Sequence, residues 1–261
     1  MNNYYAVVTG ASSGIGRAIS IKLAERGFNI IAIARQHSLL DELKKVLEEL
    51  NSNIEVVTKS CDLSNTENAI SLYEELKSFD IRVWVNNAGI GYYGDAFKQP
   101  IKEVKTLLNL NINTLAVLSL MYIRDHQFSD NSQLINVSSA GGYTIVPTAI
   151  TYCGSKFFVS SFTEGLAHEL LRSDAKVKVK LLAPAATKTN FGRIANGVDE
   201  YDYDKVFGTY HSSDELADFF MQLYDSESVI GYVDRESFSF KLMDNKMPYA
   251  NNNKFNQKVP M

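Results

Sequence analysis

Cysteine and histidine are scarce in this chain of 261 residues, which contains two of the first and four of the second. Cys61 and Cys153 form no spaced framework, so a disulfide-stabilised secreted domain is disfavoured and reduced thiols in a cytoplasm are expected. The histidines form no His-Glu-x-x-His or similar pattern. We therefore expect no metal site.

Strong charge of one sign and long apolar runs are also missing. The net charge is −4, the pI is about 5.6 and the basic residues are dispersed, which favours neither nucleic acid nor an anionic membrane as partner. The longest apolar run, residues 115–123, is far shorter than a membrane span. A strand predicted from residue 4 or 5 leaves no room for a signal peptide.

What the chain does contain is an alternation of strand-like and helix-like segments. The predicted strands are residues 5–8, 29–34, 54–58, 81–85, 133–137, 177–182 and 238–242. The predicted helices between them begin near Ile15 and cover residues 39–50, 64–78, 101–124, 151–171 and 214–224, with Ser64 and Glu67 as a capping box. This order predicts one α/β domain over residues 1–261, a doubly wound parallel sheet of about seven strands with helices on both faces, as in a Rossmann fold.

A glycine-rich loop follows the first predicted strand and opens the first helix. There, glycines let the backbone approach a pyrophosphate, and free helix N–H groups attract it. The loop residues that we expect to bind a dinucleotide are Gly10, Ser12, Ser13, Gly14, Ile15 and Gly16.

Three Tyr-x-x-x-Lys pairs occur, at Tyr73, Tyr152 and Tyr201. Only Tyr152/Lys156 follows a strand-like run, which ends at Ser139, and opens a helix. We interpret the other two pairs as surface coincidences. On a helix, residues four apart share one face, so Lys156 should lie beside Tyr152 and favour its phenolate.

In this order, the glycine loop, Asn86-Asn87-Ala88-Gly89, Ser139 and Tyr152/Lys156 resemble the short-chain dehydrogenase/reductase family from about residue 5 to residue 189. The resemblance implies that Tyr152 exchanges a proton with the substrate oxygen, Ser139 binds that oxygen and Lys156 also holds the nicotinamide ribose. Asn111 matches the family residue that holds a water linked to the lysine. Asn109 and Asn113 are alternative candidates for the same role.

The resemblance also implies a cofactor. An NAD-binding fold needs an acid at the end of the second strand, but this chain has Ala34 and then Arg35, which favours the 2′-phosphate of NADP(H). Ser13 departs from the Lys or Arg of many NADP-binding members. Further expected contacts are Asp62 and Leu63 at the adenine, Asn87, Ala88 and Gly89 along the strand end, and Pro184, Thr187 and Thr189 at the carboxamide. Ala185 replaces the family's Gly, which would be strained if the position needs a positive φ.

These features predict an NADP(H)-dependent oxidoreductase that interconverts a carbonyl and an alcohol of a small molecule. A non-catalytic NADP(H)-binding regulator, a nucleotide-sugar epimerase or dehydratase, and a 3-oxoacyl carrier-protein reductase are the alternatives. We expect residues 190–211 to form a partly apolar lid, residues 244–261 to be a polar tail, and the two long helices to pair in a homodimer or homotetramer.

Overall fold

The computed structural model describes residues 4–250. One eight-stranded sheet has the order β3-β2-β1-β4-β5-β6-β7-β8. Its strands are β1 (Tyr5–Thr9), β2 (Asn29–Ala34), β3 (Val56–Ser60), β4 (Ile81–Asn86), β5 (Gln133–Val137), β6 (Lys178–Ala183), β7 (Ile230–Val233) and β8 (Phe240–Met243). Seven strands run parallel and β8 pairs antiparallel with β7, which confirms the predicted fold class.

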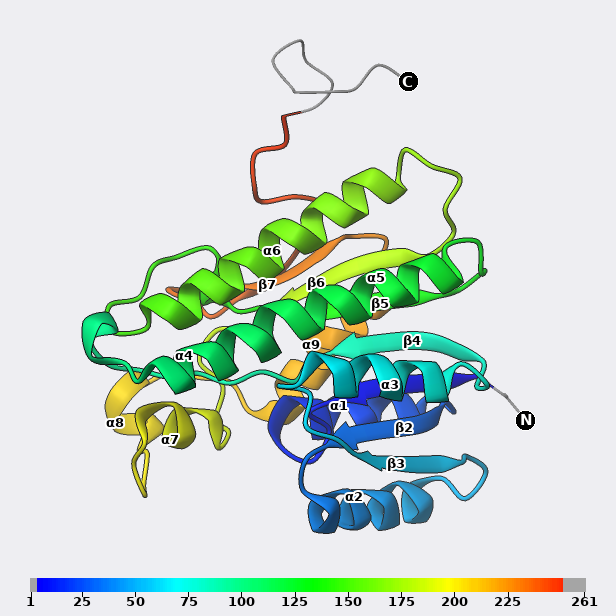
Figure 1. Ribbon diagram of the computed structural model, residues 1–261, viewed down its shortest axis with the longest axis horizontal. Coiled ribbons are helices and arrows are strands. Elements are labelled where there is room, and N and C mark those ends of the chain that lie inside the picture. Colours follow the sequence, from blue (N-terminus) through cyan, green and yellow to red (C-terminus); the bar gives the residue numbers. More distant parts are fainter. Residues whose placement is uncertain (1–3, 251–261) are drawn as a thin grey trace.

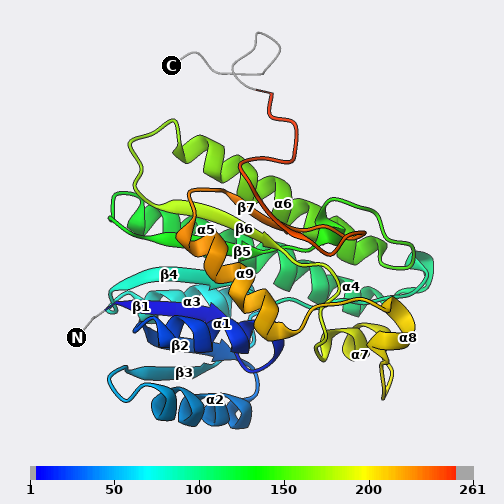
Figure 2. The same cartoon turned by 180° about the vertical axis from the view of Figure 1, so that it is seen from behind.

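Helices cover both faces of the sheet (Figure 1). One face carries α3 (Thr66–Leu76), α5 (Leu115–His126) and α6 (Ile150–Leu170). The other carries α1 (Gly14–Glu25), α2 (His37–Leu50) and α9 (Ser213–Asp225), of which α9 lies in front in Figure 2. Strand β2 is buried along its whole length because both of its faces are covered.

Three local predictions are corrected. The predicted helix at 101–124 is broken into α4 (Ile101–Leu108), a π-helical turn (Asn109–Thr114) and α5. Strand β7 was missed, because four residues that include Gly231 carry little pattern. The predicted capping box at Ser64 is wrong: the Ser64 hydroxyl donates to Asp62 at 2.8 Å, and Asn65 caps α3 by accepting the Glu67 N–H at 3.0 Å. A capping box does form at Ser212 and Glu215 of α9.

The joined segment Ile101–His126 is long and apolar enough to cross a membrane by length and composition, although half of its most apolar window is buried in the fold. Within the fold α5 contacts α3, α6, β4 and β5, as a core helix does. Since core helices of soluble proteins pass the same test, this property by itself is weak support for a span.

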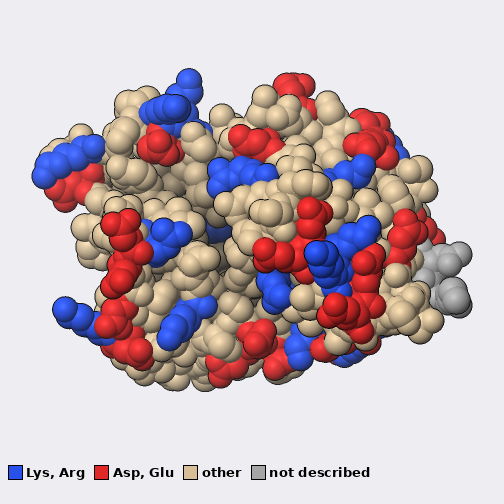
Figure 3. Space-filling model, turned by 90° about the horizontal axis from the view of Figure 1, so that it is seen from below, with Lys and Arg blue, Asp and Glu red and all other residues tan. Residues whose placement is uncertain are grey.

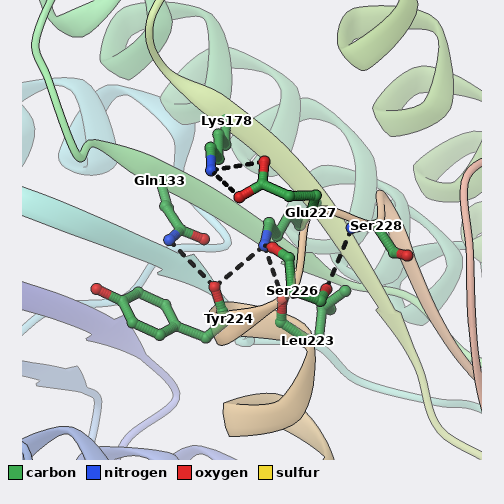
Figure 4. Close-up of polar contacts among 8 residues, drawn as sticks. Gln133, Lys178, Leu223, Tyr224, Ser226, Glu227 and Ser228 are labelled. Atoms are coloured by element: carbon green, nitrogen blue, oxygen red, sulfur yellow. Dashed lines mark hydrogen bonds and ion pairs between the residues drawn. The ribbon is translucent and has the colours of Figure 1, made fainter.

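A buried lysine, Lys180, fixes the end of α9. Figure 4 shows the residues at this end, Leu223, Tyr224 and Ser226. The Lys180 ammonium, on β6, donates to the carbonyl oxygens of Leu223, Tyr224 and Ser226 at 2.5 to 3.1 Å. Carbonyl groups in the last turn of a helix lack partners within the helix and carry partial negative charge, so a cation satisfies them well. Burial lowers the pKa of Lys180 to about 8.

The described part of the predicted tail packs on the same chain. The buried Glu164 carboxylate of α6 accepts the backbone N–H groups of Lys246 and Met247 at 2.9 and 3.0 Å. The Lys246 ammonium lies 4.3 Å from the ring centroid of Tyr232. The remainder of the predicted tail, residues 251–261, lies outside the described residues.

Candidate active site

A cavity of about 410 Å³ opens at the carboxyl ends of the parallel strands, where open α/β sheets bind ligands. Figure 3 shows the hollowed face of the molecule. Every predicted catalytic or cofactor-binding residue lines this cavity except Asn111 and Gly16, which lie just behind its wall.

Tyr152 and Lys156 occupy the first two turns of α6 and are buried. Burial raises the pKa of the Tyr152 phenol to about 12, and a hydrogen bond with Ser139 acts in the opposite direction. The Lys156 ammonium lies 5.9 Å from the Tyr152 ring centroid and donates to the Val137 carbonyl at 2.9 Å. Burial lowers the pKa of Lys156 to about 8. At neutral pH the site therefore holds a protonated phenol beside a cation.

Asn111 sits in the π-helical turn, an irregularity that is common at functional sites. Its side chain accepts the Ile90 N–H at 3.0 Å and donates to the Ile90 carbonyl at 2.9 Å and to Ser155 at 3.0 Å. A Cβ on Gly89 would lie 3.3 Å from the Asn111 amide oxygen and 3.5 Å from the Lys156 ammonium. The asparagine and the lysine thus approach the same glycine, and Asn111 braces the strand-end loop that both contact.

The glycine loop lies against the end of β4. Gly10 has φ +66°, and a Cβ there would lie 2.9 Å from the Asn87 amide nitrogen; a Cβ on Gly16 would overlap the same side chain. Asn87 donates to the Thr9 carbonyl at 2.9 Å, which ties the end of β4 to β1. This packing keeps side chains out of the floor of the cleft, so a pyrophosphate can approach the backbone at the start of α1.

The β2–β3 end of the cavity carries Arg35 and Asp62. The Arg35 side chain is exposed and forms no ion pair within residues 4–250. Hydrogen bonds from Ser64, with a smaller effect from the Arg35 charge, lower the pKa of Asp62. A cation with free N–H donors at this strand end fits a phosphate.

The loop after β6 contributes Pro184, Thr187 and Thr189 to the cavity. Ala185 has no positive φ, so replacing the family's glycine causes no backbone strain. The Thr187 hydroxyl donates to the Ala185 carbonyl at 3.0 Å, and the Thr189 hydroxyl accepts the Phe191 N–H at 3.1 Å.

The predicted lid at 190–211 contains two short helices, α7 (Phe191–Asn196) and α8 (Tyr203–Phe207). Aromatic rings surround the phenol: Phe191 and Tyr93 lie 5.3 and 6.1 Å from the Tyr152 ring centroid. Ile194, Tyr201, Tyr203 and Phe207 extend this wall. Val198 and Tyr210 of the same segment do not line the cavity, and neither do the aromatic residues Tyr92 and Tyr143.

The prediction that the other two Tyr-x-x-x-Lys pairs lie on the surface is wrong for their tyrosines. Tyr73 is buried and donates to Asp125 at 3.2 Å, and Lys77 lies 5.7 Å from its ring, nearly the geometry of the Tyr152 pair. Tyr201 belongs to the lid wall. The i, i+4 geometry is therefore not sufficient to mark a catalytic pair; the position of the pair in the cavity is needed.

Sequence reasoning missed Arg235, which follows β7 and lines the cavity. Cys153 also lines it, and its sulfur accepts the Val146 N–H at 3.4 Å. Among residues 4–250 no group of three or more His, Cys, Asp or Glu side chains lies together as metal ligands do.

A family model described as short chain dehydrogenase matches residues 4–197. The chain belongs to the short-chain dehydrogenase family. Its relatives are named as dehydrogenases and reductases, and it is an oxidoreductase acting on CH–OH and C=O groups.

Curated relatives of this short-chain dehydrogenase include dehydrogenase/reductase SDR family member 11 of Homo sapiens, 26% identical over 78% of this chain and 80% of that protein. The 7beta-hydroxysteroid dehydrogenase of Clostridium sardiniense is 31% identical over 71% of this chain and 70% of that protein. A solved short-chain dehydrogenase from Sphingobium yanoikuyae in complex with NADPH is 26% identical, with a TM-score of 0.77 over 87% of this chain and 86% of that one.

Proposed function

We propose that this protein is an NADP(H)-dependent oxidoreductase that interconverts a bulky ketone or aldehyde and its alcohol. The observation that carries the proposal is the placement of Ser139, Tyr152 and Lys156 in one cavity with the glycine loop. The relative solved with NADPH supports this cofactor for a chain of the same fold.

The residues of this chain fit the parts of NADP(H). Arg35 would pair with the 2′-phosphate, with Ser12 and Ser13 beside it, and Asp62 and Leu63 would border the adenine. The start of α1 would hold the pyrophosphate, and Thr187 and Thr189 the carboxamide. The reduced cofactor supplies the hydride.

Tyr152 would donate the proton that the reduced carbonyl oxygen needs. Its raised pKa keeps the phenol protonated at neutral pH, and Ser139 would hold the same oxygen by hydrogen bonding. Lys156 would bind the nicotinamide ribose and stabilise the phenolate left behind. Asn111 would hold a water beside Lys156. The aromatic wall excludes bulk water and favours an apolar substrate.

A non-catalytic NADP(H)-binding protein is the alternative from another class. The complete Ser139, Tyr152 and Lys156 set argues against it, because a scaffold has no need of a buried proton donor in the cavity. We expect NADPH oxidation with at least one member of a panel of cyclic and aromatic ketones. NADPH binding without turnover across the panel would favour the scaffold, and turnover confined to 3-oxoacyl carrier-protein thioesters would favour that reductase branch.

We further propose a cytoplasmic homodimer or homotetramer. Support comes from apolar side chains that the long helices leave at least partly uncovered, such as the exposed Leu120 on α5 and the half-buried, stacked Phe158 and Phe162 on α6. Sedimentation at micromolar concentration should show an assembly larger than one chain; a monomer alone would contradict the proposal.

A further inference from the structure

Arg235 is a cation in the cavity that neither the cofactor nor the proton transfer uses. It lies in the turn between β7 and β8, beyond the part of the chain that the family model matches. We propose that Arg235 binds a carboxylate on the substrate, so that the physiological ketone is an apolar compound with an acidic group. This inference rests on the proposed function and names its substrate class.

The sheet order separates Arg235 from the predicted phosphate contacts. Arg35 follows β2, whereas Arg235 follows β7, five strands away in the same sheet. At ~4.8 Å per strand, the two strand ends are roughly 24 Å apart. Arg35 and Arg235 therefore lie at opposite ends of the cavity, and only Arg35 is placed for the 2′-phosphate. Arg235 lies on the side of β5 and β6, whose ends carry Ser139 and Pro184.

The charge around Arg235 is not neutralised within the described part of the chain. The charged residues lining the cavity are Arg35, Asp62, Lys156 and Arg235, so the one carboxylate is at the far end. The neighbouring Asp234 carboxylate accepts the Glu236 and Ser237 N–H groups at 3.1 and 2.9 Å and pairs with Lys241 at 3.8 Å. Glu236 is exposed and forms no ion pair with Arg235. The guanidinium thus keeps a planar set of donors that fits a carboxylate through two parallel hydrogen bonds.

The turn that carries Arg235 is fixed to the site. Asp234 and Ser239 are joined by a backbone hydrogen bond of 3.0 Å, and Phe238 has φ +54°, a conformation that bulky residues rarely adopt. The Phe238 ring lies 5.8 Å from that of His211, whose backbone bridges to Thr187 in the cavity wall. Strain of this kind persists where surrounding contacts enforce it and is concentrated at functional sites.

The cavity is apolar around Tyr152. The rings of Tyr93 and Phe191 lie beside the phenol, and Ile194 is a further apolar residue of the lining. A substrate with its ketone at Tyr152 and its carboxylate at Arg235 would place an apolar body against these rings. A neutral ketone of the same shape would gain the apolar contacts and lose the ionic one.

The test compares aryl keto acids of increasing spacer length with their methyl esters, using NADPH as reductant. We expect the wild-type protein to prefer the acid at one spacer length. In Arg235→Gln, kcat/KM for that acid should fall about 10- to 100-fold, as expected for a lost charge-assisted hydrogen bond. The value for the ester should stay within about twofold, and so should the Kd of NADPH. Arg193→Gln, which removes an exposed cation on α7 outside the cavity lining, should leave the acid-to-ester ratio unchanged.

Equal losses for acid and ester in Arg235→Gln would overturn the proposal and show that the arginine only supports the turn. A weaker Kd for NADPH with no change in the ratio would assign Arg235 to the cofactor. If no ketone is turned over, the proposed function fails, and the Arg235 site is judged separately by calorimetry. Keto acid binding to the NADP⁺-saturated protein that Arg235→Gln abolishes would then support the site, and equal binding by the variant would reject it.

Discussion

The charge of Lys156 should control the proton affinity of Tyr152, and Lys156→Met tests this directly. The ammonium lies 5.9 Å from the phenol ring centroid. For a phenolate charge placed at the ring centroid, about 6 Å from the ammonium, and an effective dielectric constant of about 20, the charge pair is worth roughly 2.8 kcal/mol, or about two pKa units. Removing the cation should therefore raise the pKa of the phenol by about two units. Alcohol oxidation needs the phenolate, so kcat/KM for oxidation near pH 7 should fall about 100-fold.

The pH dependence gives this prediction its sharpest form. Burial lowers the pKa of Lys156 to about 8, so the wild-type protein itself loses the ammonium charge as the pH rises above that value. The ratio of wild-type to Lys156→Met activity should be largest below pH 8 and should shrink above it. The measurement is kcat/KM for alcohol oxidation with NADP⁺ between about pH 6 and 10, with cofactor Kd determined separately.

Lys77→Met is the matched control, because Lys77 lies 5.7 Å from the Tyr73 ring in a pair outside the cavity. We expect the ratio of wild-type to Lys77→Met activity to stay near one at every pH. A Lys156→Met loss that is constant across the pH range would refute the electrostatic reasoning. It would leave Lys156 with a binding or structural role alone.

Three further predictions follow from the same structure. Tyr152→Phe should lower turnover by about 10²–10⁴-fold while NADPH binding, followed by fluorescence quenching, barely changes; near-full ketone reduction would mean that another group is the acid. Arg35→Ala should weaken the binding of NADPH by roughly 1.5–3 kcal/mol and that of NADH far less. Ala34→Asp should shift the cofactor preference toward NADH. Equal weakening of NADPH and NADH binding by Arg35→Ala would place the 2′-phosphate contact elsewhere. Lys180→Met should lower the free energy of unfolding by about 2–4 kcal/mol at pH 7, because three carbonyl groups lose their donor. Since burial lowers the folded-state pKa of Lys180 from 10.5 to about 8, the unfolded chain binds that proton more tightly. The difference in unfolding free energy between the wild type and Lys180→Met, measured by urea titration, should therefore grow as the pH rises from about 8 to 10.5. A difference that does not change with pH would contradict a buried Lys180 ammonium with a lowered pKa.

The parts of the site that sequence reasoning located are those that a strand end determines locally. The glycine loop follows β1, Arg35 follows β2, and Ser139 follows β5. The predicted bounds of β2 and β5 agree with the structure, and those of β1 are one residue short. A buried parallel strand is a continuous apolar run, and the residue after it must lie at the ligand-binding edge. Neither step needs knowledge of which strands are neighbours.

The features that were missed depend on packing between distant segments. The helical pattern of 101–124 continues through the π-helical turn, so no residue there signals the break that positions Asn111. Tyr73 resembles a surface residue until α3 packs beside α5 and presents Asp125 to it. The lid helices are short and contain glycine and acidic residues, which hides their aromatic wall in a segment with little periodicity.

Arg235 shows most clearly what sheet order adds to sequence. In the sequence it is one arginine between an aspartate and a glutamate, which is typical of a solvated turn. The pairing of β7 with β6 brings that turn to the edge of the sheet where Ser139 and Tyr152 lie. The Asp234 carboxylate accepts two backbone N–H groups within the turn, so it does not pair with Arg235. The cavity thus has a cation at each end, one of which the cofactor phosphate would neutralise. The other cation is left for the substrate, and for this reason the charge of the ketone, more than its size, should decide which compounds this protein reduces.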